Sequence, residues 1–109
     1  IGNKAYDLVS LIDDVRFKTS NSLKTKIYDF YIRNQKKLDL DKFKNDFEIL
    51  SILRNLKIIG IFTRLAIRDG KKDYLKMIPY TWELIRLRIK NNKETNDLKI
   101  LLKKNFKNI

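Results

Sequence analysis

The fold of this chain is decided by its most apolar stretch, Arg54-Asn-Leu-Lys-Ile-Ile-Gly-Ile-Phe-Thr-Arg-Leu-Ala-Ile-Arg-Asp-Gly70. At about 100° per residue, its leucines, isoleucines and phenylalanine cover nearly the whole circumference of a helix. A helix that is apolar all round is typical of the middle of a bundle. Asp69-Gly70 is expected to end it, because glycine takes the positive φ needed just beyond a helix end.

Amphipathic helices are the main pattern in the rest of the chain. The predicted helices span residues 5–17, 23–34, 41–69 and 98–106, with a short turn at 73–77 and another helix from Pro79 to a break at Asn91. Proline suits the first position of a helix and interrupts its interior. No period-2 alternation of useful length is present. We therefore expect an all-α fold, with five or six helices packed around a long buried central helix.

Composition excludes several kinds of chemistry. With 109 residues, the chain is at most one domain. It contains no Cys and no His, which excludes disulfides, thiolate or imidazole metal sites and Ser-His catalysis. Its three glycines are isolated and form no phosphate-binding loop. No apolar run is long enough to span a bilayer and no secretory signal is visible, so we expect a cytoplasmic location and no membrane partner.

The net charge of +12 is concentrated in the second half of the chain. Residues 1–53 carry ten Lys and Arg against eight acids, and residues 54–109 carry fifteen against five. Such a basic half is compatible with nucleic acid, an anionic surface or a phosphate-bearing ligand. Most of the cations are lysines spread among many asparagines and isoleucines, which favours a solvated surface instead.

Lys57, Arg64 and Arg68 form the best candidate binding constellation, because their spacing places them on one side of the central helix. Arginine on a rigid helix can bind phosphate or carboxylate through two hydrogen bonds, but a solvent-facing stripe is the more common outcome. The adjacent acids Asp13 and Asp14 diverge by about 100° on a helix, so we expect a solvated face rather than a shared site.

Aromatic residues give a weaker signal. Trp82, with Tyr80 and Tyr74, could stack on a base or a sugar, although residues at helical spacing are more often part of the core. Gly60 lies inside the central helix, where glycine is unfavourable. It either allows a neighbouring element to approach closely or is tolerated there without a packing role.

Two stretches carry a resemblance to a known family. Gly2-Asn-Lys-Ala-Tyr-Asp-Leu-Val-Ser-Leu-Ile-Asp-Asp-Val-Arg16 resembles the segment just after the metal-binding Asp of the aminoglycoside/choline-kinase-like phosphotransferases, where the pattern is Gly-Pro-x-Ala-Tyr-Asp-Leu-Ala-Ser-Leu. The stretch from Arg54 to Tyr74 and on to Trp82 resembles the C-terminal helices of one bacterial branch, which includes the anomeric kinase of N-acetylmuramate and N-acetylglucosamine. In that branch, the corresponding pattern is Arg-Asn-Leu-Lys-Ile-Leu-Gly-Ile-Phe-x-Arg-Leu.

The resemblance implies that residues 1–109 form a single helical subdomain, similar to the C-terminal part of a protein-kinase-like fold. In such kinases the nucleotide-binding lobe, the catalytic loop and the metal-binding Asp precede this region, and none of them is present here. The chain would then be a fragment of a larger two-lobed kinase and inactive alone. ATP, magnesium, a sugar acceptor and the missing N-terminal lobe are implied for the parent protein.

The resemblance also points to individual residues. Asp7 matches the acid of the Tyr-Asp-Leu motif and is expected to support the catalytic loop. Arg54, Arg64, Arg68 and Asp69 match positions on the acceptor-substrate side, where they would bind substrate or brace that loop. No residue of this chain is expected to be catalytic or to ligate metal.

Two further expectations follow. In a fragment, the apolar stripe from Ala5 to Val15 should be left without partners. The alternative function is a stand-alone basic helical module that binds nucleic acid or an anionic surface, and this alternative requires salt-dependent binding of nucleic acid. We do not expect nucleic acid as a partner under the kinase interpretation.

Overall fold

The computed structural model describes residues 4–35, 38–90 and 95–106, and its regular structure is helical throughout these ranges. The helices are α1 (Lys4–Ile12), α2 (Asn21–Arg33), α3 (Leu40–Arg68), the 3₁₀ helix η1 (Lys72–Met77), α4 (Ile78–Ile89) and α5 (Asn96–Asn105). The predicted all-α architecture is confirmed. The predicted break at Asn91 lies outside the described residues.

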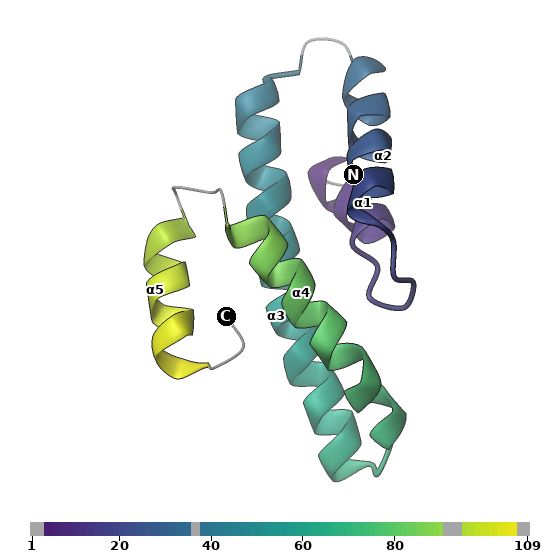
Figure 1. Cartoon of the computed structure of the whole chain (residues 1–109), viewed down its shortest axis with the longest axis vertical. Coiled ribbons are helices and arrows are strands. Elements are labelled where there is room, and N and C mark those ends of the chain that lie inside the picture. Colours follow the sequence, from purple (N-terminus) through teal and green to yellow (C-terminus); the bar gives the residue numbers. More distant parts are fainter. Residues whose placement is uncertain (1–3, 36–37, 91–94, 107–109) are drawn as a thin grey trace.

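Helix α3 is the central element of the molecule. It runs along the long axis, with α1 and α2 beside its upper half and α4 along its lower half (Figure 1). The 3₁₀ helix η1 turns the chain at the lower tip, so that α4 returns against α3. The long central helix predicted from the sequence is thus confirmed.

The core consists of two apolar clusters that share α3. The first joins α1 to the N-terminal half of α3 and consists of Ala5, Leu8, Val9, Ile12, Phe43 and Phe47. The second joins α3 to α4 and α5 and consists of Ile52, Trp82, Ile85, Ile89 and Leu102. Burying apolar surface in both clusters is the main force that holds the helices together.

Burial of α3 is one-sided. The helix buries six residues, namely Phe43, Phe47, Ser51, Ile52, Asn55 and Ala66. On other sides, Leu53 is 52% exposed and Ile67 is 79% exposed. The apolar character all round the helix is therefore real, but the rest of this chain covers only part of its circumference.

Local signals in the sequence account for where the helices begin and end. Ser20 and Asp39 cap α2 and α3 by accepting hydrogen bonds from the backbone N–H groups of Leu23 and Lys42, three residues further on, at 3.2 and 3.1 Å. Gly70 has φ = 67°, as predicted for a residue that ends α3. These signals fix the start of both helices and the end of α3.

The predictions for Pro79 and Gly60 have different outcomes. Pro79 lies in the first turn of α4, as expected. Gly60 does not mark a close approach, because a Cβ built there meets no described atom within 4 Å beyond its own helix.

Two expectations about the N-terminal segment are wrong. Helix α1 ends at Ile12 instead of continuing to Phe17, because the carboxylate of Asp14 accepts a hydrogen bond from the backbone N–H of Arg16 at 2.9 Å and forms a local turn in place of the next helical turn. Most of the apolar stripe of α1 is not left without partners either, although Leu11 is 65% exposed. Its residues Leu8 and Val9 are buried against the phenylalanines of α3.

Candidate functional site

A fully buried carboxylate lies where four helices meet. Asp13, directly after α1, has no exposed surface. Arg88 of α4 donates to both of its oxygens, from Nε to Oδ2 at 2.7 Å and from Nη2 to Oδ1 at 2.8 Å. Ser51 of α3 donates its hydroxyl to Oδ2 at 2.6 Å. A buried charge is tolerated only when it is paired and hydrogen-bonded, and Asp13 satisfies both conditions.

Lys24 of α2 completes this buried network. Its side chain is only 3% exposed, and Nζ donates to Asp13 Oδ1 at 3.2 Å and to the carbonyl oxygen of Ile12 at 2.6 Å. The ammonium group also lies 5.6 Å from the ring centroid of Tyr80, at a distance typical of cation–π contacts. One carboxylate therefore connects α1, α2, α3 and α4.

The pKa of Asp13 lies below its ordinary value. Burial alone would raise this pKa, because it disfavours the charged form. The hydrogen bonds and positive charge of Arg88, the hydrogen bond from Ser51 and the charge of Lys24 together outweigh burial. Because its oxygens already accept four hydrogen bonds, the carboxylate acts as a structural anchor and is not available for proton transfer.

The expectation of a solvated face is wrong for Asp13. It is four residues after the buried Val9, so it lies on the continuation of the apolar stripe of α1, and this was the available signal. Asp14 behaves differently, since its carboxylate pairs at 2.8 Å with the exposed guanidinium of Arg16. The hydrogen bonds from Arg16 are the main reason that the pKa of Asp14 is also lowered.

A second feature is a groove of about 400 Å³ between α1 and α3. Its lining residues are Tyr6, Leu50, Leu53, Arg54, Lys57, Ile58 and Ile61. Arg54 donates from Nη1 to the hydroxyl of Ser10, and its guanidinium carbon lies 5.6 Å from the ring centroid of Tyr6. Its Nε atom is buried and donates to no acceptor in the described part of the chain. The groove thus combines apolar side chains with two cations.

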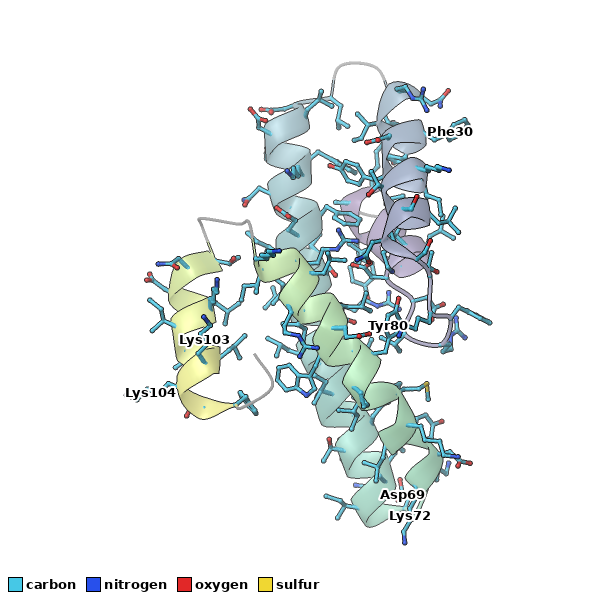
Figure 2. The ribbon with its side chains drawn as sticks, in the orientation of Figure 1. Phe30, Asp69, Lys72, Tyr80, Lys103 and Lys104 are labelled. Carbon is cyan, nitrogen blue, oxygen red and sulfur yellow. The ribbon has the colours of Figure 1, made fainter. Side chains whose placement is uncertain are left out.

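The residues singled out by the sequence do not gather in one place. Arg54 faces α1, whereas Asp69 lies at the far tip of the molecule where α3 meets η1 (Figure 2). Arg54 and Arg68 are separated by about 20 Å along α3, at 1.5 Å per residue. Asp7 on α1 and Arg64 on α3 are exposed. The roles of these residues in binding substrate or bracing a loop stay predictions.

The aromatic residues belong mostly to the core. Trp82 is 5% exposed and packs against Phe106 with ring centroids 5.3 Å apart. Tyr74 packs against Phe62 at 4.9 Å. Tyr80 points toward the connection between α1 and α2, where its hydroxyl accepts a hydrogen bond from the backbone N–H of Thr19 at 3.3 Å (Figure 2). Trp82 and Tyr74 are therefore packing residues, as their helical spacing favoured.

A third feature is a cationic pocket of about 470 Å³ where the start of α2 faces α4. Lys18, Arg86 and Lys90 line it together with Tyr80. Glu83 lies in the same wall and its carboxylate is 3.6 Å from the ammonium of Lys18. The excess of positive charge would suit an anionic group.

Within residues 4–35, 38–90 and 95–106, no cluster of three or more acidic side chains could hold a metal ion. No helix in the same ranges is long and apolar enough to cross a membrane.

Comparison with known proteins gives one consistent result. No family model matches the chain. It is 34% identical to the N-acetylmuramate/N-acetylglucosamine kinase of Caulobacter vibrioides, over 75% of this chain and 23% of that protein. The kinases of the same name from Neisseria meningitidis serogroup B and Pseudomonas aeruginosa are 36% and 32% identical, over 72% and 57% of this chain and 25% and 18% of their own length.

These similarities confirm the resemblance to this branch of sugar kinases, which was inferred from the motifs around Tyr6 and Arg54. The chain spans about a quarter or less of the length of the curated relatives that it matches.

Proposed function

We propose that this chain is the helical, acceptor-substrate side of an ATP-dependent small-molecule phosphotransferase that acts on a sugar. The observation that carries the proposal is its similarity to three kinases named for N-acetylmuramate and N-acetylglucosamine. The motifs in residues 2–16 and 54–82 resemble the aminoglycoside/choline-kinase-like phosphotransferases, and the proposal assigns the chain to the C-terminal helices of that fold.

Phosphoryl transfer depends mainly on positioning and on stabilising negative charge, so a helical subdomain can contribute without supplying a base. In this proposal, Asp7 supports the catalytic loop, and Arg54, Arg64, Arg68 and Asp69 bind the acceptor or brace that loop. ATP and magnesium bind to the remainder of the parent enzyme. The Asp13 network supports this role, because it keeps α1 and α4 in fixed positions against α3.

The isolated chain is expected to be inactive. Its sequence contains no His, no Cys and no glycine-rich phosphate loop. Its most deeply buried carboxylate, Asp13, is already engaged by Arg88, Lys24 and Ser51. In this proposal, the general base and the phosphate-binding loop are supplied by the remainder of the parent enzyme.

The second candidate function is a stand-alone basic module that binds nucleic acid or an anionic surface. The net charge of +12 and the cationic pocket lined by Lys18, Arg86 and Lys90 favour it. Such binding would weaken steeply as salt is raised, because bound counterions are released from the polyanion. A sugar kinase requires no such salt-dependent binding.

The two candidates are separated by expressing the natural reading frame that contains these residues. The intact product is weighed by mass spectrometry and assayed for ATP-dependent phosphorylation of N-acetylglucosamine and N-acetylmuramate, with the isolated 109 residues as the control. The kinase proposal predicts a product well above 13.1 kDa that phosphorylates a sugar, and an inactive control. A 13.1 kDa product that binds polynucleotides with strong salt dependence would contradict it.

A further inference from the structure

The groove between α1 and α3 exposes apolar surface that the two core clusters leave uncovered. Tyr6 is 43% exposed and Leu53 is 52% exposed, and Ile58 and Ile61 are partly exposed beside them. The surface is continuous, because all four residues line the same groove. Contiguous apolar surface of this kind marks a contact with another piece of protein more often than an isolated exposed leucine does.

The charges in the groove specify its partner further. Arg54 and Lys57 line it, and no acidic residue is among the lining side chains. Arg54 is partly exposed and Lys57 is exposed, so both cations can be reached by a docking segment. A carboxylate is the strongest acceptor for a guanidinium.

A second copy of this chain is a poor partner for the groove. Two copies that met through this face would bring Arg54 and Lys57 of one copy toward the same residues of the other. Each chain carries a net charge of +12, so the approach would also be opposed by long-range repulsion. The occupant must instead supply apolar side chains and negative charge.

We infer that the groove is covered by the remainder of the kinase polypeptide, through an apolar segment that presents a carboxylate to Arg54 and Lys57. This inference rests on the proposed function. The matched relatives are at least four times longer than the region they share with this chain, since that region covers no more than 25% of their length. Under the proposed function, the rest of such a kinase belongs to the same polypeptide as this chain, so it is always available to cover the groove.

The test uses a hybrid kinase, in which this chain replaces the matching segment of the Caulobacter vibrioides relative. The substitutions Leu53→Asp and Lys57→Glu alter the groove. Ile67→Asp is the matched control, because Ile67 lies on the same helix, is 79% exposed and does not line the groove. Each substitution is made both in the hybrid and in the isolated 109 residues, and thermal unfolding is followed in all of them.

The isolated chain should unfold at nearly the same temperature with all three substitutions, because none of the three side chains is buried there. In the hybrid, Leu53→Asp and Lys57→Glu should lower the unfolding temperature clearly, whereas Ile67→Asp should not. Equal behaviour of the groove variants and the control in the hybrid would overturn the inference. Independent unfolding of this segment in the hybrid would also overturn it.

The same experiment distinguishes failure of the docking surface from failure of the proposed function. A hybrid that unfolds as one unit and is sensitive at Leu53 and Lys57, but that phosphorylates no sugar, supports the docking surface and contradicts the sugar-kinase proposal. A hybrid that phosphorylates a sugar and is insensitive at the groove supports the proposed function and overturns the docking surface.

Discussion

Arg88 of α4 forms a two-point ion pair with Asp13, a residue 75 positions earlier in the chain, with N–O distances of 2.7 and 2.8 Å. The guanidinium carbon of Arg88 also lies 4.8 Å from the ring centroid of Phe47, so the ion pair is set against the first apolar cluster. Ser51, which donates to the same carboxylate, precedes Ile52 of the second cluster. The pair thus connects the two halves of the core.

Replacing the carboxylate is predicted to destabilise the chain strongly. In Asp13→Asn, the nearly buried cations Lys24 and Arg88 lose their counterion while the surrounding packing is kept. Breaking a buried ion pair on one side costs about 3–5 kcal/mol of the free energy of unfolding. Urea unfolding followed by circular dichroism measures this loss.

Asp14→Asn is the matched control for that substitution. Its partner Arg16 is 70% exposed, and ion pairs of this kind contribute about 0–1 kcal/mol. A loss of similar size for both variants would contradict the assignment of Asp13 as the structural anchor.

Acid is predicted to weaken the fold through the same carboxylate. The pKa of Asp13 is lower in the folded chain than in the unfolded chain, where it is about 3.9. Its stabilising contribution is therefore fully present well above the unfolded pKa and is lost as the pH falls through the folded pKa. The free energy of unfolding, measured from neutral pH into strong acid, should fall less steeply in Asp13→Asn. An identical pH dependence would show that Asp13 is not the responsible group.

Alkali is predicted to act through Tyr28. Burial is the main cause that raises the pKa of its phenol to about 12, with a contribution from the charge of Glu48. Because the folded pKa is above the unfolded value of about 10, the contribution is complete below the unfolded pKa and is lost as the pH rises toward the folded one.

Tyr28→Phe keeps the ring that packs edge-on against Phe47 at 5.1 Å and removes the titrating hydroxyl. Its free energy of unfolding should decline less than that of the unmodified chain between about pH 9 and about pH 12, when measured by urea titration. A parallel decline in both proteins would refute the role of Tyr28.

Replacing Gly60 and Gly70 with alanine is predicted to change the free energy of unfolding in opposite directions. Gly60→Ala should raise the free energy of unfolding by about 0.5–1 kcal/mol, because glycine is unfavourable inside a helix and a Cβ there meets no described neighbour. Gly70→Ala should lower it by about 1–2 kcal/mol, because its φ of 67° strains any residue with a Cβ. Thermal unfolding of both variants checks the signs, and a shift in the same direction would contradict the assignment.

Helix periodicity predicts the helical fold well because its signals are local. The caps at Ser20 and Asp39, the stop at Gly70 and the position of Pro79 depend only on neighbouring residues. The central helix is recognisable from its continuous apolar pattern. Its partial exposure is not, because coverage depends on which other segments are present to pack against it.

The buried network does not follow from local signals in the same way. The sequence predicts a solvent-exposed Asp13, because acidic side chains are normally exposed. Arg88, which neutralises its buried charge, is on another helix. Arg88 precedes the buried Ile89 and follows the buried Ile85 by three residues, so its place on the apolar face of α4 is a usable signal. Nothing local in the sequence identifies Lys24 as the further buried partner.

The proposal that this chain serves a sugar kinase is tested most directly by phosphoryl transfer in the hybrid kinase. The assay follows the ATP-dependent phosphorylation of N-acetylglucosamine and N-acetylmuramate by the hybrid, with the Caulobacter vibrioides kinase as the positive control and that kinase lacking the segment as the negative control. If this chain serves a sugar kinase, the folded hybrid should recover the phosphorylation that the truncated kinase has lost. A hybrid that unfolds as a single unit but is no more active than the truncated kinase would contradict it.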